Sequence, residues 1–340
     1  MQVGLVLPQG YFNEFEGWEP TRAWARIVEL AQTAERLGFE SIWTGEHVIS
    51  KWPGESIAFD CWTLSSGLAP LVPRVGIGLI VLNSTFHNPA ITAKAASTLD
   101  AISGGRLTLG LGAGFKDNEA RQYGHDYPPL KERMEWLSEH FEIIWRMTRQ
   151  DEPAFSFEGR YARVENMTNS PRAARSPGVK LLIGGHGKNY TMRLAARYCD
   201  ELNLNVFADQ VPALLEVFHE RCAEIGRDPA TVELNCGTNQ IMRYKGLRVT
   251  GGQRFAEPHE LAYQDPERVA NVGTRAEELA QWRELGFHRL TAGIPGLHNT
   301  DEGLYEFIDD CRIAGIDFFD RPAAERGGTP PAATAVESAT

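Results

Sequence analysis

Short apolar runs alternate with longer amphipathic segments along most of the chain. The runs are rich in Val, Leu and Ile and lack the polar alternation of a strand with one face in water, so each indicates a strand covered on both faces. Eight such strands are expected, at residues 3–7, 40–44, 75–82, 106–111, 181–183, a run that ends at Leu204, 232–236 and 289–292.

The segments between the runs carry apolar residues at helical spacing and have recognisable ends. In residues 20–37, for example, Ile27, Ala31 and Ala34 share one face, Pro20 opens the helix and Gly38 closes it. Helices are expected at 20–37, 59–69, 88–102, 130–147, 191–198, 210–225, 274–285 and 304–314.

Three segments depart from this alternation. Residues 150–179 are expected to hold a short strand pair and a loop, and the long polar segment 244–271 is a second insertion. Residues 321–340 have too few apolar side chains to bury, which predicts a disordered tail.

Eight strands alternating with about eight helices, without a linker-like break, predict an α/β fold: a single (β/α)8 TIM barrel with insertions over residues 1–320, followed by the tail 321–340. A doubly wound sheet would have fewer strands. In a barrel, the ligand site is built from the segments that follow the C-terminal ends of the strands.

Composition narrows the class of ligand. The formal net charge is −11 and no run of Lys or Arg occurs, which argues against a nucleic-acid partner and favours a small molecule. The five cysteines are widely spaced and are expected to be reduced core thiols. No apolar run approaches a membrane span, and Met1 leads directly into a strand, so a cytoplasmic protein without a membrane segment is expected.

A glycine turn follows the fifth strand. Gly184, Gly185 and Gly187, with His186 between them, let the backbone bend sharply and present N–H groups at the start of the next helix. A phosphate fits such a place. A tight turn that needs glycine for its dihedral angles alone is the other interpretation of this pattern, and the motif by itself leaves both open.

Other strand ends supply candidate polar groups. His47 follows the second strand, and its imidazole suits proton transfer to or from a bound substrate. Taken by itself, however, a single histidine is more often a hydrogen-bonded structural residue. Glu46 could orient His47 or the ligand, or cap the next segment. Further candidates after the third and fourth strands are Asn83, Gly112, Gly114 and Asn118. No HExxH, CxxC, GxSxG or Walker motif occurs, so a metal site has little support.

Three segments together carry a family resemblance. They are GEH at residues 45–47, VLNSTFHNPAITAKAASTLDAISGGRLTLGLGAG at 81–114, and LLIGGHGKNYTMRLAARYCDELN at 181–203. In this order and at these barrel positions, they resemble the bacterial luciferase-like flavin oxidoreductase family, and more closely its branch that uses coenzyme F420, a deazaflavin. The resemblance covers roughly residues 3–236 and, more weakly, the last two strand–helix units.

The resemblance implies a barrel with insertions whose mouth holds the cofactor ring, in a homodimer. A non-proline cis peptide or a bulge is implied under the ring, near Ile80 and Val81. His47 would act beside the ring. The phosphate would bind at Gly184, Gly185, His186 and Gly187, and Asn83 and Asn118 would touch polar groups of the cofactor. Phe115 stands where the sugar-phosphate dehydrogenase of this family has a carboxylate, so that substrate is not assigned.

The leading hypothesis is an oxidoreductase that transfers a hydride between coenzyme F420 and a small organic substrate. The turn GGHG at 184–187, where the flavin mononucleotide enzymes usually have a serine, favours the deazaflavin. The alternatives are a monooxygenase that uses reduced flavin mononucleotide (FMN) and oxygen, and a noncatalytic flavin- or deazaflavin-binding protein. The aromatic loop with Phe12 and Trp18, together with residues 244–271, is expected to cover the barrel mouth.

Overall fold

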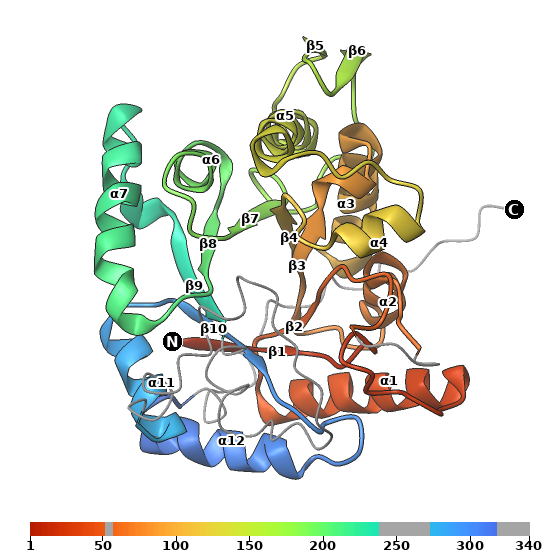
Figure 1. Cartoon of the computed structure of the whole chain (residues 1–340), viewed down its shortest axis with the longest axis vertical. Helices are drawn as coiled ribbons and strands as arrows, with labels where there is room; N and C mark the ends of the chain where they lie inside the picture. Colours follow the sequence, from red (N-terminus) through yellow and green to blue (C-terminus); the bar gives the residue numbers. More distant parts are fainter. Residues whose placement is uncertain (52–56, 238–272, 318–340) are drawn as a thin grey trace, which may run out of the picture.

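Eight parallel strands close into a barrel. The computed structural model describes residues 1–51, 57–237 and 273–317, and Figure 1 shows how its elements are arranged. The strands follow one another around the barrel in the order β1-β10-β9-β8-β7-β4-β3-β2. Their bounds are β1 Gln2–Val6, β2 Ser41–Thr44, β3 Gly76–Asn83, β4 Leu107–Gly112, β7 Lys180–Gly184, β8 Glu201–Leu204, β9 Glu233–Gly237 and β10 Arg289–Gly293. This confirms the predicted fold class.

Helices surround the barrel and bury their apolar stripes against it (Figure 1). Helix α3 illustrates the local signals: the Asn88 side chain accepts hydrogen bonds from the first turn, and Gly104 ends the helix in a left-handed conformation. The α-helices in the described ranges are α1 Pro20–Leu37, α2 Cys61–Leu68, α3 Pro89–Ser103, α4 Asp117–Gln122, α5 Leu130–Thr148, α6 Thr191–Tyr198, α7 Val211–Glu224, α11 Arg275–Glu284 and α12 Glu302–Ile313.

The predicted elements are confirmed within about two residues at each end, in line with the uncertainty of helix limits. The antiparallel pair of β5 Phe155–Glu158 and β6 Arg163–Met167 is the strand pair expected in residues 150–179. Helix α4 was not predicted, because its six residues, DNEARQ, carry no apolar periodicity. The insertion 244–271 and the tail 321–340 lie outside the described residues.

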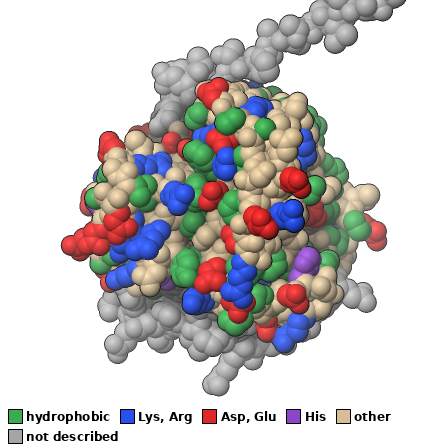
Figure 2. All heavy atoms as spheres, turned by 90° about the horizontal axis from the view of Figure 1, so that it is seen from above, with side chains coloured by type: hydrophobic (Ala, Val, Ile, Leu, Met, Phe, Trp, Pro, Cys, Tyr) green, Lys and Arg blue, Asp and Glu red, His purple; other side chains and the backbone are tan. Residues whose placement is uncertain are grey.

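All five cysteines are free and buried, as predicted. No helix among the described residues is both long and apolar enough to cross a membrane. Figure 2 shows one face of the molecule, on which positive and negative side chains are interspersed rather than gathered into a basic patch. That face therefore presents no single-sign field for a nucleic acid.

Charged side chains close the N-terminal end of the barrel. Lys180 lies 2.9 Å from Glu201 and 2.5 Å from Glu233, and Arg289 Nε lies 3.0 Å from Glu201 and also pairs with Glu40. Burial lowers the pKa of Arg289 to about 10, and these carboxylates satisfy its donors. Because this end is filled by a paired network, a ligand must enter from the opposite end, where the strands finish.

Because His140 is buried, we expect the folded protein to lose stability in acid. It is 1% exposed, its Nε2 accepts from Trp136 Nε1 at 2.7 Å, and burial, with a smaller effect of His87, lowers its pKa from 6.5 to about 3. Below pH 6.5 the imidazole of His140 is protonated in the unfolded chain but stays neutral in the folded protein. The free energy of unfolding therefore falls as the pH drops from 6.5 towards 3.

From pH 7.5 to pH 5.0, His140 is expected to cost the wild type about 2 kcal/mol of unfolding free energy. The His140→Gln variant keeps an acceptor for Trp136 and should lack this loss. Urea denaturation of both proteins at the two pH values measures the difference. Equal pH dependence in the two proteins would contradict the assignment.

Candidate active site

His47 lies just after β2, between an aromatic ring and a carboxylate. Its ring stacks on Tyr11 with a centroid separation of 3.4 Å and an interplanar angle of 11°. Its Nδ1 lies 3.0 Å from Oε1 of Glu119, whose side chain is only 4% exposed. Donation from Nδ1 to this carboxylate leaves Nε2 as the nitrogen that can exchange a proton with a ligand. This arrangement is that of a general acid or base with an orienting partner.

Sequence reasoning missed Glu119. The family resemblance implied a carboxylate only directly after the glycines that follow the fourth strand, where this chain has Phe115. The carboxylate that contacts His47 belongs to Glu119, one helical turn after Phe115. It lies on helix α4, which was not predicted and which begins after Lys116. Phe115 itself stands edge-on to His47, with a centroid separation of 5.6 Å and an interplanar angle of 87°.

Glu46 makes its contacts away from His47. Its Oε2 accepts from the backbone N–H of Asn83 at 2.6 Å, and its Oε1 lies 2.5 Å from Nε2 of His87. The carboxylate therefore ties the end of β2 to the end of β3. Glu119 therefore orients His47, whereas Glu46 holds the backbone at Asn83. The sequence had pointed to Glu46 as a catalytic candidate, but had not singled out His87.

The end of β3 has the irregular backbone that the family resemblance implied. The peptide between Ile80 and Val81 is cis, and the pairing with β4 shifts register between Leu79 and Leu82. A side chain at Gly112 would come within 2.7 Å of Val81 Cγ2. The glycine at this position thus makes room for Val81, a reason that is visible only in the folded barrel.

Asn83 and Gly114 form a second close fit. The Asn83 Oδ1 accepts from the backbone N–H and the hydroxyl of Thr85, at 3.1 and 2.9 Å. A Cβ on Gly114, which has φ of +71°, would lie 2.3 Å from that oxygen. Asn118, the other predicted amide, is exposed on α4 beside Glu119 in the chain. Asn83 is therefore buried at the end of β3, whereas Asn118 is exposed on α4.

The glycine turn after β7 offers unused donors at a helix start. Gly185 has φ of +130°, and its N–H donates to the Asn203 carbonyl at 3.1 Å. Among the described residues, the N–H groups of His186, Gly187 and Lys188 donate to no protein acceptor. Helix α6 then begins without a side-chain cap. Free N–H groups at an uncapped helix N-terminus suit a phosphate, so this turn fits the phosphate of a flavin or deazaflavin.

The loop expected to cover the mouth has two parts. Tyr11 stacks on His47, and Phe12 packs edge-on against Tyr11 with a centroid separation of 4.7 Å, so this part does lie with His47. Trp18 instead packs on Phe15, which is fully buried, and under the guanidinium of Arg22. The second proposed cover, residues 244–271, lies outside the described residues.

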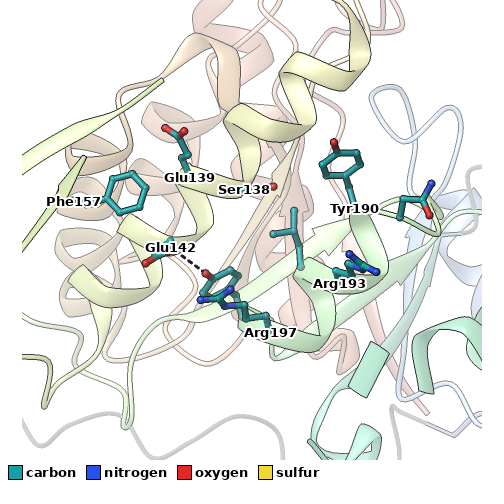
Figure 3. A pocket seen from close by; sticks show the side chains of 10 residues that line it. Ser138, Glu139, Glu142, Phe157, Tyr190, Arg193 and Arg197 are labelled. Atoms are coloured by element: carbon teal, nitrogen blue, oxygen red, sulfur yellow. Dashed lines mark hydrogen bonds between the residues drawn. The ribbon is translucent and has the colours of Figure 1, made fainter. Parts of the chain in front are cut away.

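A groove of about 560 Å³ lies in the outer helical layer, between α5 and α6 (Figure 3). Arg193 and Arg197 line one side and Glu142 the other, where its carboxylate accepts from the Tyr198 hydroxyl at 3.1 Å. Most of its lining side chains come from α5 and α6, with Phe157 from β5 and Asn189 and Tyr190 from the segment before α6. It lies outside the barrel mouth, where we place the candidate site. Among the described residues, no cluster of His, Cys, Asp or Glu could hold a metal ion.

Comparison with known proteins places this architecture in a family. The family model described as luciferase-like monooxygenase matches residues 1–244. The chain belongs to this family. The resemblance drawn from the sequence segments is thereby confirmed, and the luciferase-like barrel accounts for the strand-end site.

Individual relatives of this luciferase-like chain carry names that include coenzyme F420. The F420-dependent glucose-6-phosphate dehydrogenase of Amycolatopsis mediterranei is 33% identical over 183 residues, which is 53% of each chain. That of Intrasporangium calvum is 28% identical over 317 residues, covering 79% of this chain and 89% of the relative. The chain thus spans about half the length of the first and most of the second.

Solved structures share the fold. An F420-dependent secondary alcohol dehydrogenase in complex with an F420-acetone adduct superposes with a TM-score of 0.70 at 20% identity, covering 92% of this chain and 98% of that one. EDTA monooxygenase from Chelativorans sp. BNC1 superposes with a TM-score of 0.74 at 14% identity, covering 96% of each chain. At these identities the likeness concerns the fold.

Proposed function

We propose that this luciferase-like protein is a coenzyme F420-dependent oxidoreductase that transfers a hydride between the deazaflavin and a small organic substrate. The observation that carries the proposal is the pair of His47 and Glu119 at the barrel mouth, which provides an oriented proton donor or acceptor. The relatives named as F420-dependent dehydrogenases support the choice of coenzyme.

The protein's part in the reaction follows from its own residues. When bound, the deazaflavin supplies or accepts the hydride. Glu119 holds the imidazole of His47 so that Nε2 gives a proton to, or takes one from, the oxygen or nitrogen on the reacting carbon. The residues that would hold the coenzyme are Ile80, Val81, Asn83, Gly112, Gly114, Asn118, Gly184, Gly185, His186 and Gly187.

The main alternative is a monooxygenase that uses reduced FMN and oxygen. It is favoured by the monooxygenases among the structural neighbours, which share the whole barrel. The phosphate site at the glycine turn would serve either cofactor, because both carry a phosphate beyond the ring. The tricyclic ring systems are also similar in shape, so the choice between them needs a direct measurement.

Equilibrium titration separates the two. Purified protein is titrated with oxidised F420 and with oxidised FMN, and binding is followed by quenching of the protein's tryptophan fluorescence. Both titrations are repeated with the reduced cofactors in the absence of oxygen. We expect F420 to bind at least about tenfold more tightly than FMN, a difference of about 1.4 kcal/mol. Tighter binding of reduced FMN, with oxygen-dependent product formation, would replace this proposal with the monooxygenase.

A homodimer and a cytoplasmic location remain proposals that rest on the family resemblance and on the sequence. Light scattering during gel filtration of the full chain measures the first. A noncatalytic binding protein is the third candidate function, and it is separated from an enzyme by the response to replacement of His47.

A further inference from the structure

We infer that the substrate is an uncharged carbonyl or carbinol compound with an aromatic or alicyclic ring next to its reacting carbon, and that Phe115 selects it. This inference rests on the proposed function, because it takes His47 as the group that exchanges the proton. It goes beyond that function by naming the class of substrate and the side chain that recognises it.

Approach to His47 is restricted on two sides. Tyr11 covers one face of the imidazole at a centroid separation of 3.4 Å, and Glu119 occupies Nδ1. Phe115 stands nearly perpendicular to the imidazole at 5.6 Å. A substrate that brings its oxygen to Nε2 must therefore place the rest of its structure beside aromatic rings.

Phe115 is half exposed, at 50%, although it lies beside a side chain proposed to be catalytic. Tyr11, by comparison, is only 7% exposed. An exposed aromatic ring at the mouth of a binding site gains from a ligand that covers it, because the covered area leaves water and the rings attract each other edge to face or offset. A ring on the substrate supplies that surface, whereas a polyhydroxylated or phosphorylated chain does not.

The charged group in contact with His47 is a carboxylate rather than a cation. Glu119 places a carboxylate directly behind the imidazole. Lys116 lies over the ring of Phe115 at 5.2 Å, and Lys51 lies over the ring of Phe12 at 5.6 Å, so both cations are at aromatic faces. A neutral substrate avoids repulsion from Glu119, and it leaves Lys116 in place when its ring contacts the edge of Phe115 or the face opposite Lys116.

Reduction of a ketone shows how the hydride and the proton would be transferred. The carbonyl carbon gains the hydride that reduced F420 supplies, and a C–H bond forms as the π electrons of the C=O bond move to oxygen. His47 Nε2 delivers the proton to that oxygen, and solvent returns a proton to His47. The ketone becomes a secondary alcohol, and the coenzyme is left oxidised.

The test compares acetophenone with acetone, two ketones that differ in the ring. Binding of each to protein loaded with oxidised F420 is measured by calorimetry, which needs no turnover, and reduction of each is measured with reduced F420. We expect acetophenone to bind at least about tenfold more tightly than acetone. Phe115→Ala should remove most of that preference, while the matched aromatic variant Phe115→Tyr should keep it.

Three outcomes overturn the inference: equal affinity for the two ketones, an equal effect of Phe115→Ala on both, or a preference for charged substrates. The last would appear as faster reduction of the anionic ketone phenylpyruvate than of acetophenone with reduced F420, or as faster oxidation of glucose 6-phosphate than of 1-phenylethanol with oxidised F420. The F420 titration is performed separately. If F420 does not bind more tightly than FMN, the proposed coenzyme is wrong, and the same ketone comparison is made on FMN-loaded protein. Binding of acetophenone that depends on Phe115 would then still support the substrate class, and its absence would reject it.

Discussion

Replacing His47 with asparagine is expected to slow hydride transfer by about 100- to 10,000-fold, the usual contribution of a general acid or base. The affinity for F420 should stay within a few-fold of the wild type. Asparagine is the informative choice because its amide N–H can still donate to Glu119 in place of Nδ1, so the buried carboxylate keeps a partner. What is lost is the Nε2 position, which carries the proton.

Single-turnover mixing of enzyme, coenzyme and substrate measures this step, and cofactor fluorescence gives the affinity. Glu119→Gln is the companion variant: it keeps an acceptor near Nδ1 but removes the charge that stabilises an imidazolium, so it should slow the same step and shift its pH profile. Near wild-type transfer in His47→Asn would refute a catalytic role. A loss confined to coenzyme binding would make His47 a ring-positioning residue, and loss of the fold would make it structural.

Placing a carboxylate at the glycine turn is expected to abolish binding of the coenzyme phosphate. Gly187→Asp is the cleaner of two variants, since Gly187 is exposed and an added Cβ would lie 3.0 Å from the Thr191 hydroxyl, a contact that a small shift relieves. Two negative charges about 4 Å apart near a protein surface repel by about 4 kcal/mol, which is roughly a thousandfold in affinity. The fold should survive.

Alanine variants separate charge from backbone effects. Gly187→Ala adds the Cβ without the charge and should bind F420 within about tenfold of the wild type. Gly185→Asp should also lose binding, but Gly185 has φ of +130°, so any side chain there is strained and Gly185→Ala is its necessary control. Unchanged F420 affinity in folded Gly187→Asp protein would remove the turn from the site.

The elements of the barrel could be predicted from the sequence because their signals are local. Apolar periodicity, Pro20 and Asn88 at helix starts, and Gly38 and Gly104 at helix ends depend on residues only a few positions apart. The alternation of strands and helices then restricts the topology, and the topology gathers all strand ends at one face. For this reason His47, Asn83 and the glycine turn were correctly expected at the barrel mouth, whereas their roles towards a coenzyme remain proposals.

The partners of these residues were decided by the tertiary structure. Glu119 meets His47 across 72 positions of sequence, and Glu46 turns to His87 and to the Asn83 backbone rather than to its neighbour His47. Such contacts depend on strand register and on the irregular end of β3, which bring distant side chains within 3 Å. A pattern of residue types determines which face of a strand or helix is buried. It does not determine which carboxylate lies against which imidazole, because that choice is made by the packing of the closed barrel.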